Sequence, residues 1–137
     1  MARSYLSQAE IRIRMAEIAF ERQNYPYVVR QSQEAVELSL KAALRLVGIE
    51  PPRWHDVGPI LRRFRERFPE WFKNHIEEFA FISRQLRRER EPSMYGDKEL
   101  GISPNELYTR YDAQIALSWA RQVYELCRRL YDELSRD

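Results

Sequence analysis

The sequence predicts an all-α protein, folded as an antiparallel up-and-down bundle of about five helices. Apolar side chains recur at steps of three and four along nearly all of its 137 residues, and no segment alternates as a strand does. Hydrophobic residues make up 44% of the chain and only four residues are glycine, which favours a packed core over a disordered chain. We therefore expect one domain over residues 1–137, with short connections between antiparallel helices.

The first two helices are predicted over residues 5–23 and 26–47. Proline is tolerated in a first helical turn, so Pro26 fits the start of the second helix, and Gly48 fits its left-handed end. The second helix carries two apolar stripes, one of them built largely from Ala and Ser. A helix that is apolar on two sides is expected to form the spine of the bundle.

The second half of the chain is predicted to contain three more helices. Pro51 and Pro52 end the preceding segment, and Asp56 is a candidate N-cap for a helix over residues 57–67. A helix over residues 70–89 follows Pro69, then an irregular stretch from 90 to 103, and then a long helix over 104–135.

Composition narrows the class of protein. The formal net charge of +2 is too small to indicate nucleic-acid binding, although only three of the 23 basic residues are Lys. An Arg-rich composition suits phosphate binding, but base composition of the genome or a hot habitat is the preferred explanation. The single Cys127 fits a reducing cytosol, and no apolar run approaches the ~20 residues of a membrane span. We expect a cytoplasmic protein without a membrane anchor, and without a metal or cofactor because ligand pairs at zinc spacing are missing.

Six polar or glycine positions stand at spacings typical of a known family. The recurring elements are a QxAxExxxKA-like helix, a glycine after it, and a His-Asp pair at the next helix start, here Gln33, Glu37, Lys41, Gly48, His55 and Asp56. In this pattern the chain resembles the HEPN (higher eukaryote and prokaryote nucleotide-binding) helical domains. The resemblance implies a homodimer that binds nucleotide or RNA and is partnered by a small nucleotidyltransferase. It also implies that the motif residues help to determine the helical bundle, whether or not they contact a ligand.

The two imidazoles favour structural roles. His55 could be a general acid or base, but a brace at the helix entry is the simpler interpretation, because the sequence shows no catalytic partner. The resemblance agrees, since the His-Asp pair is architectural in the family. His75 is expected to be a solvated helix residue.

Four arginines lie near the end of the predicted helix over residues 70–89. They are Arg84, Arg87, Arg88 and Arg90. Cations there compensate the negative end of the helix dipole, which is the structural interpretation. The functional interpretation is a phosphate site, with Tyr95 stacking on a base or donating its hydroxyl. The resemblance favours the functional interpretation, because the family's Arg motif lies in this region.

Many HEPN proteins are metal-independent ribonucleases that use an Arg followed after a short spacer by His. The matching candidates for a catalytic pair are Arg90 and Tyr95, so Tyr stands in place of the His. A tyrosine hydroxyl with an ordinary pKa of about 10 is a poor general base at neutral pH. The second Arg-rich segment, Arg62–Arg67, is expected to be a solvated face, with a nucleic-acid stripe as the alternative.

Three functions remain open from the sequence. The first is a nucleotide- or RNA-associated HEPN subunit of a toxin–antitoxin-like module with a small nucleotidyltransferase. The second is an active metal-independent endoribonuclease using Arg90 and Tyr95. The third is a non-catalytic helical bundle that only binds a partner.

Overall fold

Helices provide nearly all the secondary structure of the chain in its computed structural model, which describes residues 1–53 and 56–135. The α-helices are α1 (Ala2–Glu21), α2 (Tyr25–Leu46), α3 (Gly58–Arg63), α4 (Glu70–Lys73), α5 (Ile76–Arg88), α6 (Arg90–Tyr95), α7 (Pro104–Leu107) and α8 (Arg110–Leu134), with a 3₁₀ helix η1 (Arg65–Arg67). Over the described ranges no strand forms, and a single isolated bridge joins Asp97 to Ile102. The predicted all-α class is confirmed.

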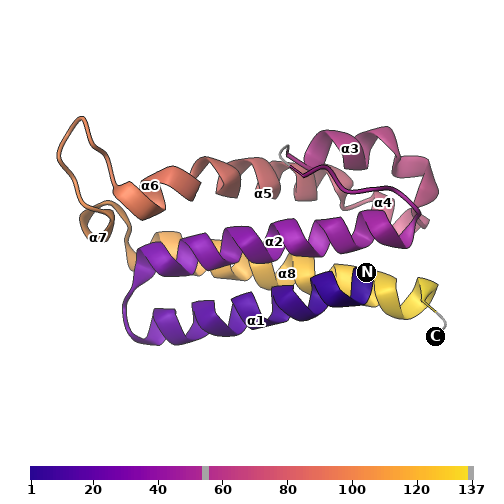
Figure 1. Cartoon of the computed structure of the whole chain (residues 1–137), viewed down its shortest axis with the longest axis horizontal. Helices are drawn as coiled ribbons and strands as arrows, with labels where there is room; N and C mark the ends of the chain where they lie inside the picture. The colour runs from indigo at the N-terminus through magenta and orange to yellow at the C-terminus, as the bar shows by residue number, and fades with distance from the viewer. Residues whose placement is uncertain (54–55, 136–137) are drawn as a thin grey trace.

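The long helices run along the long axis of the molecule and alternate in direction. In chain order, α1, α2, the pair α5 and α6, and α8 each run opposite to the one before, and both termini lie at the same end (Figure 1). The up-and-down bundle predicted from the sequence is therefore present. The short helices α3 and α4 lie at the end where the termini are, and α7 lies at the other end (Figure 1).

The second helix is the spine of this bundle, as its two apolar stripes predicted. It packs against α1, α8, α5 and α6. Val28 on one stripe and Leu40 on the other are both fully buried. Ala35, Ala42 and Ala43 are also fully buried, and their small side chains let the neighbouring helices approach closely.

Local signals set both ends of α2. The side chain of Asn24 accepts a hydrogen bond from the backbone N–H of Tyr27 at 3.4 Å, which caps the first turn. At the other end Gly48 has φ +80°. Its N–H donates to the Arg45 carbonyl at 3.0 Å and that of Ile49 donates to the Leu44 carbonyl at 2.9 Å. These two bonds form a Schellman motif, so the predicted left-handed end is confirmed.

Three of the predicted helix boundaries are wrong in the second half of the chain. The helix predicted over 57–67 ends at Arg63, because Phe64 (φ −107°, ψ 24°) leaves helical geometry and only η1 follows. The helix predicted over 70–89 is divided into α4 and α5 around residues 74–75. The helix predicted over 104–135 is divided at Tyr108, which is extended between α7 and α8.

The stretch predicted to be irregular, residues 90–103, begins instead with helix α6. Pro92 is its third residue, within the first turn where proline costs no hydrogen bond. Gly96 then ends α6, and the bridge between Asp97 and Ile102 closes a tight loop with bonds of 2.8 and 3.0 Å. Because α6 packs against α2, it brings Arg90 to the spine of the bundle.

Candidate phosphate-binding site

A polar stripe runs along the face of α2 that meets α5 and α6. Gln33, Glu37 and Lys41 follow one another at steps of four residues, so they lie on one side of the helix. Glu37 lies 3.7 Å from the Lys41 ammonium, which confirms the predicted local ion pair. It also accepts a hydrogen bond of 3.0 Å from Arg87 on α5, so the stripe connects two helices that are far apart in sequence.

A cavity of about 230 Å³ lies between α2 and α6, next to this stripe. We call it the phosphate pocket; its lining residues are Tyr27, Arg30, Gln31, Gln33, Glu34, Arg90 and Met94. The charged residues among them are the cations Arg30 and Arg90 and the anion Glu34. Arg12 on α1 partly neutralises this carboxylate at 4.0 Å and donates a hydrogen bond of 3.4 Å to Gln31. The pocket therefore has a net positive charge.

The side chain of Arg30 is the strongest indication of an anionic ligand. Its guanidinium lies over the ring of Tyr27, 5.1 Å from the centroid. Its Nε atom is buried and has no hydrogen-bond acceptor among the residues that the structure describes. A buried charged donor without an acceptor costs free energy, and the Nε of Arg45, which does not line this pocket, is in the same state.

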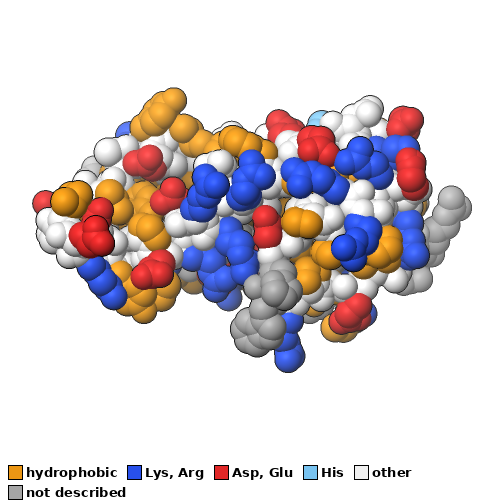
Figure 2. Space-filling model, turned by 90° about the horizontal axis from the view of Figure 1, so that it is seen from above, with side chains coloured by type: hydrophobic (Ala, Val, Ile, Leu, Met, Phe, Trp, Pro, Cys, Tyr) orange, Lys and Arg blue, Asp and Glu red, His pale blue; other side chains and the backbone are white. Residues whose placement is uncertain are grey.

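The structure separates the four predicted arginines. Only Arg90 lines the phosphate pocket. Arg87 is half-buried and held by Glu37, whereas Arg84 is exposed and lies 5.9 Å from the ring centroid of Phe81. Arg88 is exposed and does not line the pocket. Basic side chains nevertheless gather along the middle of the face formed by α5 and α6 (Figure 2), which is a favourable approach for a phosphate backbone.

The predicted partner of Arg90, Tyr95, does not line the pocket. Its side chain is 55% exposed at the end of α6, and the ammonium of Lys98 lies 4.9 Å from its ring centroid. The pocket instead combines Arg90 with Arg30 and Tyr27. Sequence reasoning missed these two residues because they precede Arg90 by about sixty positions and occupy a helix whose pattern indicates only packing.

The His-Asp pair is described only at its second residue, because His55 lies outside the described residues. Asp56 accepts hydrogen bonds from the backbone N–H of Gly58 at 3.2 Å and from the Ser83 hydroxyl at 2.7 Å. It therefore links the start of α3 to the middle of α5, although Val57 and not Asp56 occupies the predicted N-cap position. The ring of His75 stacks on Phe79 with centroids 5.7 Å apart, and its Nδ1 lies 3.5 Å from Glu78.

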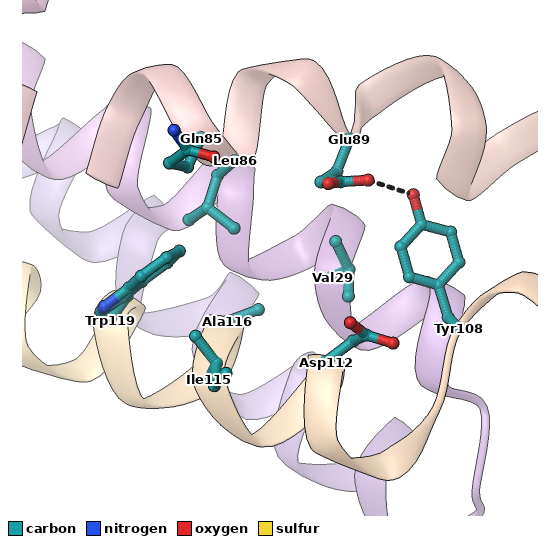
Figure 3. A pocket seen from close by; sticks show the side chains of 9 residues that line it. All are labelled: Val29, Gln85, Leu86, Glu89, Tyr108, Asp112, Ile115, Ala116 and Trp119. Carbon is teal, nitrogen blue, oxygen red and sulfur yellow. Dashed lines mark hydrogen bonds between the residues drawn. The ribbon is translucent and has the colours of Figure 1, made fainter. Parts of the chain in front are cut away.

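A second cavity, of about 180 Å³, opens between α5 and α8 with α2 as its floor (Figure 3). It has the opposite character, because the carboxylates of Glu89 and Asp112 face into it. The Tyr108 hydroxyl donates a hydrogen bond of 2.6 Å to Glu89. Burial raises the pKa of Tyr108 far above its ordinary value, and this hydrogen bond raises it further. Two carboxylates repel a phosphate, so this cavity is not the anion site.

The second Arg-rich segment is engaged within the protein. Arg62 and Arg65 both pair with Glu77 on α5, at 3.0 and 2.8 Å. Arg67 donates to the backbone carbonyl of Val47 at 3.3 Å, beyond the end of α2. These contacts agree with the structural interpretation of this segment.

The described part of the chain contains neither a candidate metal site nor a candidate membrane-spanning helix. Residues 1–53 and 56–135 contain no group of three or more His, Cys, Asp or Glu side chains arranged to hold a metal ion. Over the same residues, no helix is both long and apolar enough to cross a membrane.

Comparison with known proteins agrees with this architecture. The chain is 29% identical over 133 residues to "Putative toxin MJ1304" of Methanocaldococcus jannaschii, a match that covers 93% of this chain and 86% of that protein. The crystal structure of TT1696 from Thermus thermophilus has the same fold, with a TM-score of 0.75 at 24% identity, covering 93% of this chain and 96% of that one. The model of the HEPN domain matches residues 2–130. This chain therefore belongs to the HEPN domain family.

Proposed function

We propose that this protein is the nucleotide- or RNA-associated subunit of a toxin–antitoxin-like module, and that its phosphate pocket binds the phosphates. The observation that carries the proposal is that Arg30 from α2 and Arg90 from α6 line one cavity, with the Nε of Arg30 buried and lacking an acceptor among the described residues. The relative from M. jannaschii that carries the word toxin in its name supports the biological setting.

The proposal extends to two partners. A second copy of the chain would bring two phosphate pockets into one assembly, and a small nucleotidyltransferase would be the other component of the module. Both are proposed from what membership of the HEPN family implies. Co-expression with the nucleotidyltransferase, followed by size-exclusion chromatography with light scattering, tests them. Elution of this protein as a monomer, with no stable complex, would contradict both.

Binding of a short fluorescent RNA, measured by anisotropy, tests the pocket itself. Changing Arg30→Gln or Arg90→Ala should each weaken binding by about tenfold, because each removes a charged donor to phosphate. Arg88→Ala is the matched control, since Arg88 is exposed like Arg90 but does not line the pocket. An equal loss in all three variants would mean that only general charge matters. Unchanged binding in the first two would exclude the pocket.

The same RNA, incubated with protein in EDTA, separates binding from catalysis. If the protein is a metal-independent ribonuclease, cleavage survives EDTA and is lost in both Arg90→Ala and Tyr95→Phe. Binding without cleavage would leave a non-catalytic subunit. Because Tyr95 lies outside the pocket that holds Arg90, binding without cleavage is the expected result.

A further inference from the structure

A third cavity, which is apolar, shares one lining residue with the phosphate pocket. This apolar pocket has a volume of about 280 Å³ and lies between α1 and the start of α2. Its lining residues are Met15, Ile18, Ala19, Arg22, Asn24 and Tyr27. Tyr27 also lines the phosphate pocket, so the two cavities meet at this residue.

From this arrangement we propose that the two cavities form one nucleotide site, in which the apolar pocket holds the nucleobase against Tyr27. The proposal rests on the function proposed above, and it names the part of the ligand that inorganic phosphate lacks. Each cavity alone is slightly smaller than the range of about 300–1,000 Å³ typical of small-molecule sites. The two together fall within that range.

The chemistry of the apolar pocket fits a base. Met15, Ile18 and Ala19 give it an apolar wall, and Tyr27 adds an aromatic ring on which a base can stack. Arg30 lies over the same ring and lines only the phosphate pocket. The Tyr27 ring therefore has the Arg30 cation beside it where it lines the phosphate pocket. Tyr27 also lines the apolar pocket, which would hold the base.

Polar groups at the rim of the apolar pocket are mostly donors. Arg22 contributes a guanidinium, and the carbonyl oxygen of Asn24 is already used to cap α2, accepting from the backbone of Tyr27. The amide nitrogen of Asn24 is the group left to meet a ligand. Ring nitrogens and carbonyl oxygens of nucleobases are acceptors, so these donors complement them.

Exposed apolar residues on α1 add to the case and also supply a control. Ile18 and Ile11 lie two turns apart on the same helix and are 55% and 54% exposed. Only Ile18 lines the apolar pocket. The same substitution at both positions therefore removes equal side chains from equally exposed sites, and only one of them is expected to touch a base.

Calorimetry with uridine 5′-monophosphate, adenosine 5′-monophosphate and ribose 5-phosphate tests the proposal. Wild-type protein should bind at least one nucleotide about tenfold more tightly than ribose 5-phosphate, as expected for one stacked base. Ile18→Ser should remove most of this preference and leave the affinity for ribose 5-phosphate unchanged. Ile11→Ser should change neither affinity.

The outcomes distinguish this inference from the proposed function. If ribose 5-phosphate binds in a manner that needs Arg90, and neither base adds affinity, the phosphate site stands and the nucleobase pocket is wrong. If Ile11→Ser weakens nucleotide binding as much as Ile18→Ser does, the effect belongs to the helix and not to the pocket. If none of the three ligands binds while the short RNA still binds in a manner that needs Arg90, the nucleobase pocket is wrong and the phosphate pocket stands; if the RNA does not bind either, both proposals fail.

Discussion

The carboxylate of Glu37 lies between the cationic side chains of Arg87 and Lys41, at 3.0 and 3.7 Å. All three side chains are largely shielded from solvent, with 25%, 28% and 15% of their surfaces exposed. A bond of this kind is worth more than a surface ion pair, because water screens it less. The family's motif positions on α2 thus have a physical role in holding α5 against the spine.

Replacing this carboxylate by an amide should weaken the fold. Glu37→Gln removes the negative charge that pairs with both cations, and we expect the free energy of unfolding to fall by about 1–2 kcal/mol. Glu34→Gln is the control, since Glu34 is on the same helix, is 44% exposed, and lies 4.0 Å from Arg12. It should cost less than about 0.5 kcal/mol. Equal midpoints for both variants in urea unfolding would mean that the Glu37 network contributes no stability.

At the scale of elements, a helix boundary could be predicted from the sequence where one strong local signal determined it. The Schellman end of α2 followed from Gly48, and the apolar stripes identified the spine. Helices α4 to α8 were harder, because their apolar spacing continues across the breaks and only local backbone bonds interrupt it. The division before α8 did have a signal, since Thr109 and Asp112 form a capping box. The phosphate pocket could not be predicted in full, because Arg30 and Arg90 meet only after α6 packs on α2.

The loop after α6 illustrates a constraint that the sequence does not reveal. Gly96 has φ +72° and ψ −155°, and a Cβ atom there would lie 2.0 Å from the carbonyl oxygen of Ile102. Gly48 also has a positive φ, but the nearest atom to a Cβ there is 3.9 Å away, at the end of the Arg67 side chain. Both positions carry backbone strain for any other residue, and only Gly96 adds a clash with backbone.

We therefore expect the two glycines to differ when changed to alanine. Gly48→Ala should cost about 1 kcal/mol, the ordinary cost of a left-handed residue with a Cβ. Gly96→Ala should cost at least about 3 kcal/mol or open the bridge between Asp97 and Ile102, because that backbone region is nearly exclusive to glycine. Thermal unfolding of both variants measures the costs, and amide exchange at Asp97 and Ile102 detects opening of the bridge. Similar melting temperatures with protected amides would show that the loop relaxes freely.

At the scale of the whole molecule, burial in the bundle controls the response of stability to alkaline pH. Cys127 on α8 is fully buried, and this burial raises the pKa of its thiol far above the ordinary value. The native protein therefore keeps this proton, whereas the unfolded chain loses it above a pH of about 8.5. Because the unfolded state then binds fewer protons than the native state, stability must fall as pH rises beyond that point.

The free energy of unfolding should be flat for this thiol below a pH of about 8 and then decline by up to about 1.4 kcal/mol per pH unit. Cys127→Ala should cost about 1 kcal/mol at neutral pH through the methyl-sized cavity, yet lose less stability between pH values of about 8 and 9.5. Burial also raises the pKa values of Tyr108 and Tyr124, but their contribution begins only near a pH of about 10, above this window. Urea unfolding under reducing conditions gives both curves. Parallel curves for the two proteins would mean that water reaches the thiol in the native bundle, and the tight packing of α8 against α2 would have to be revised.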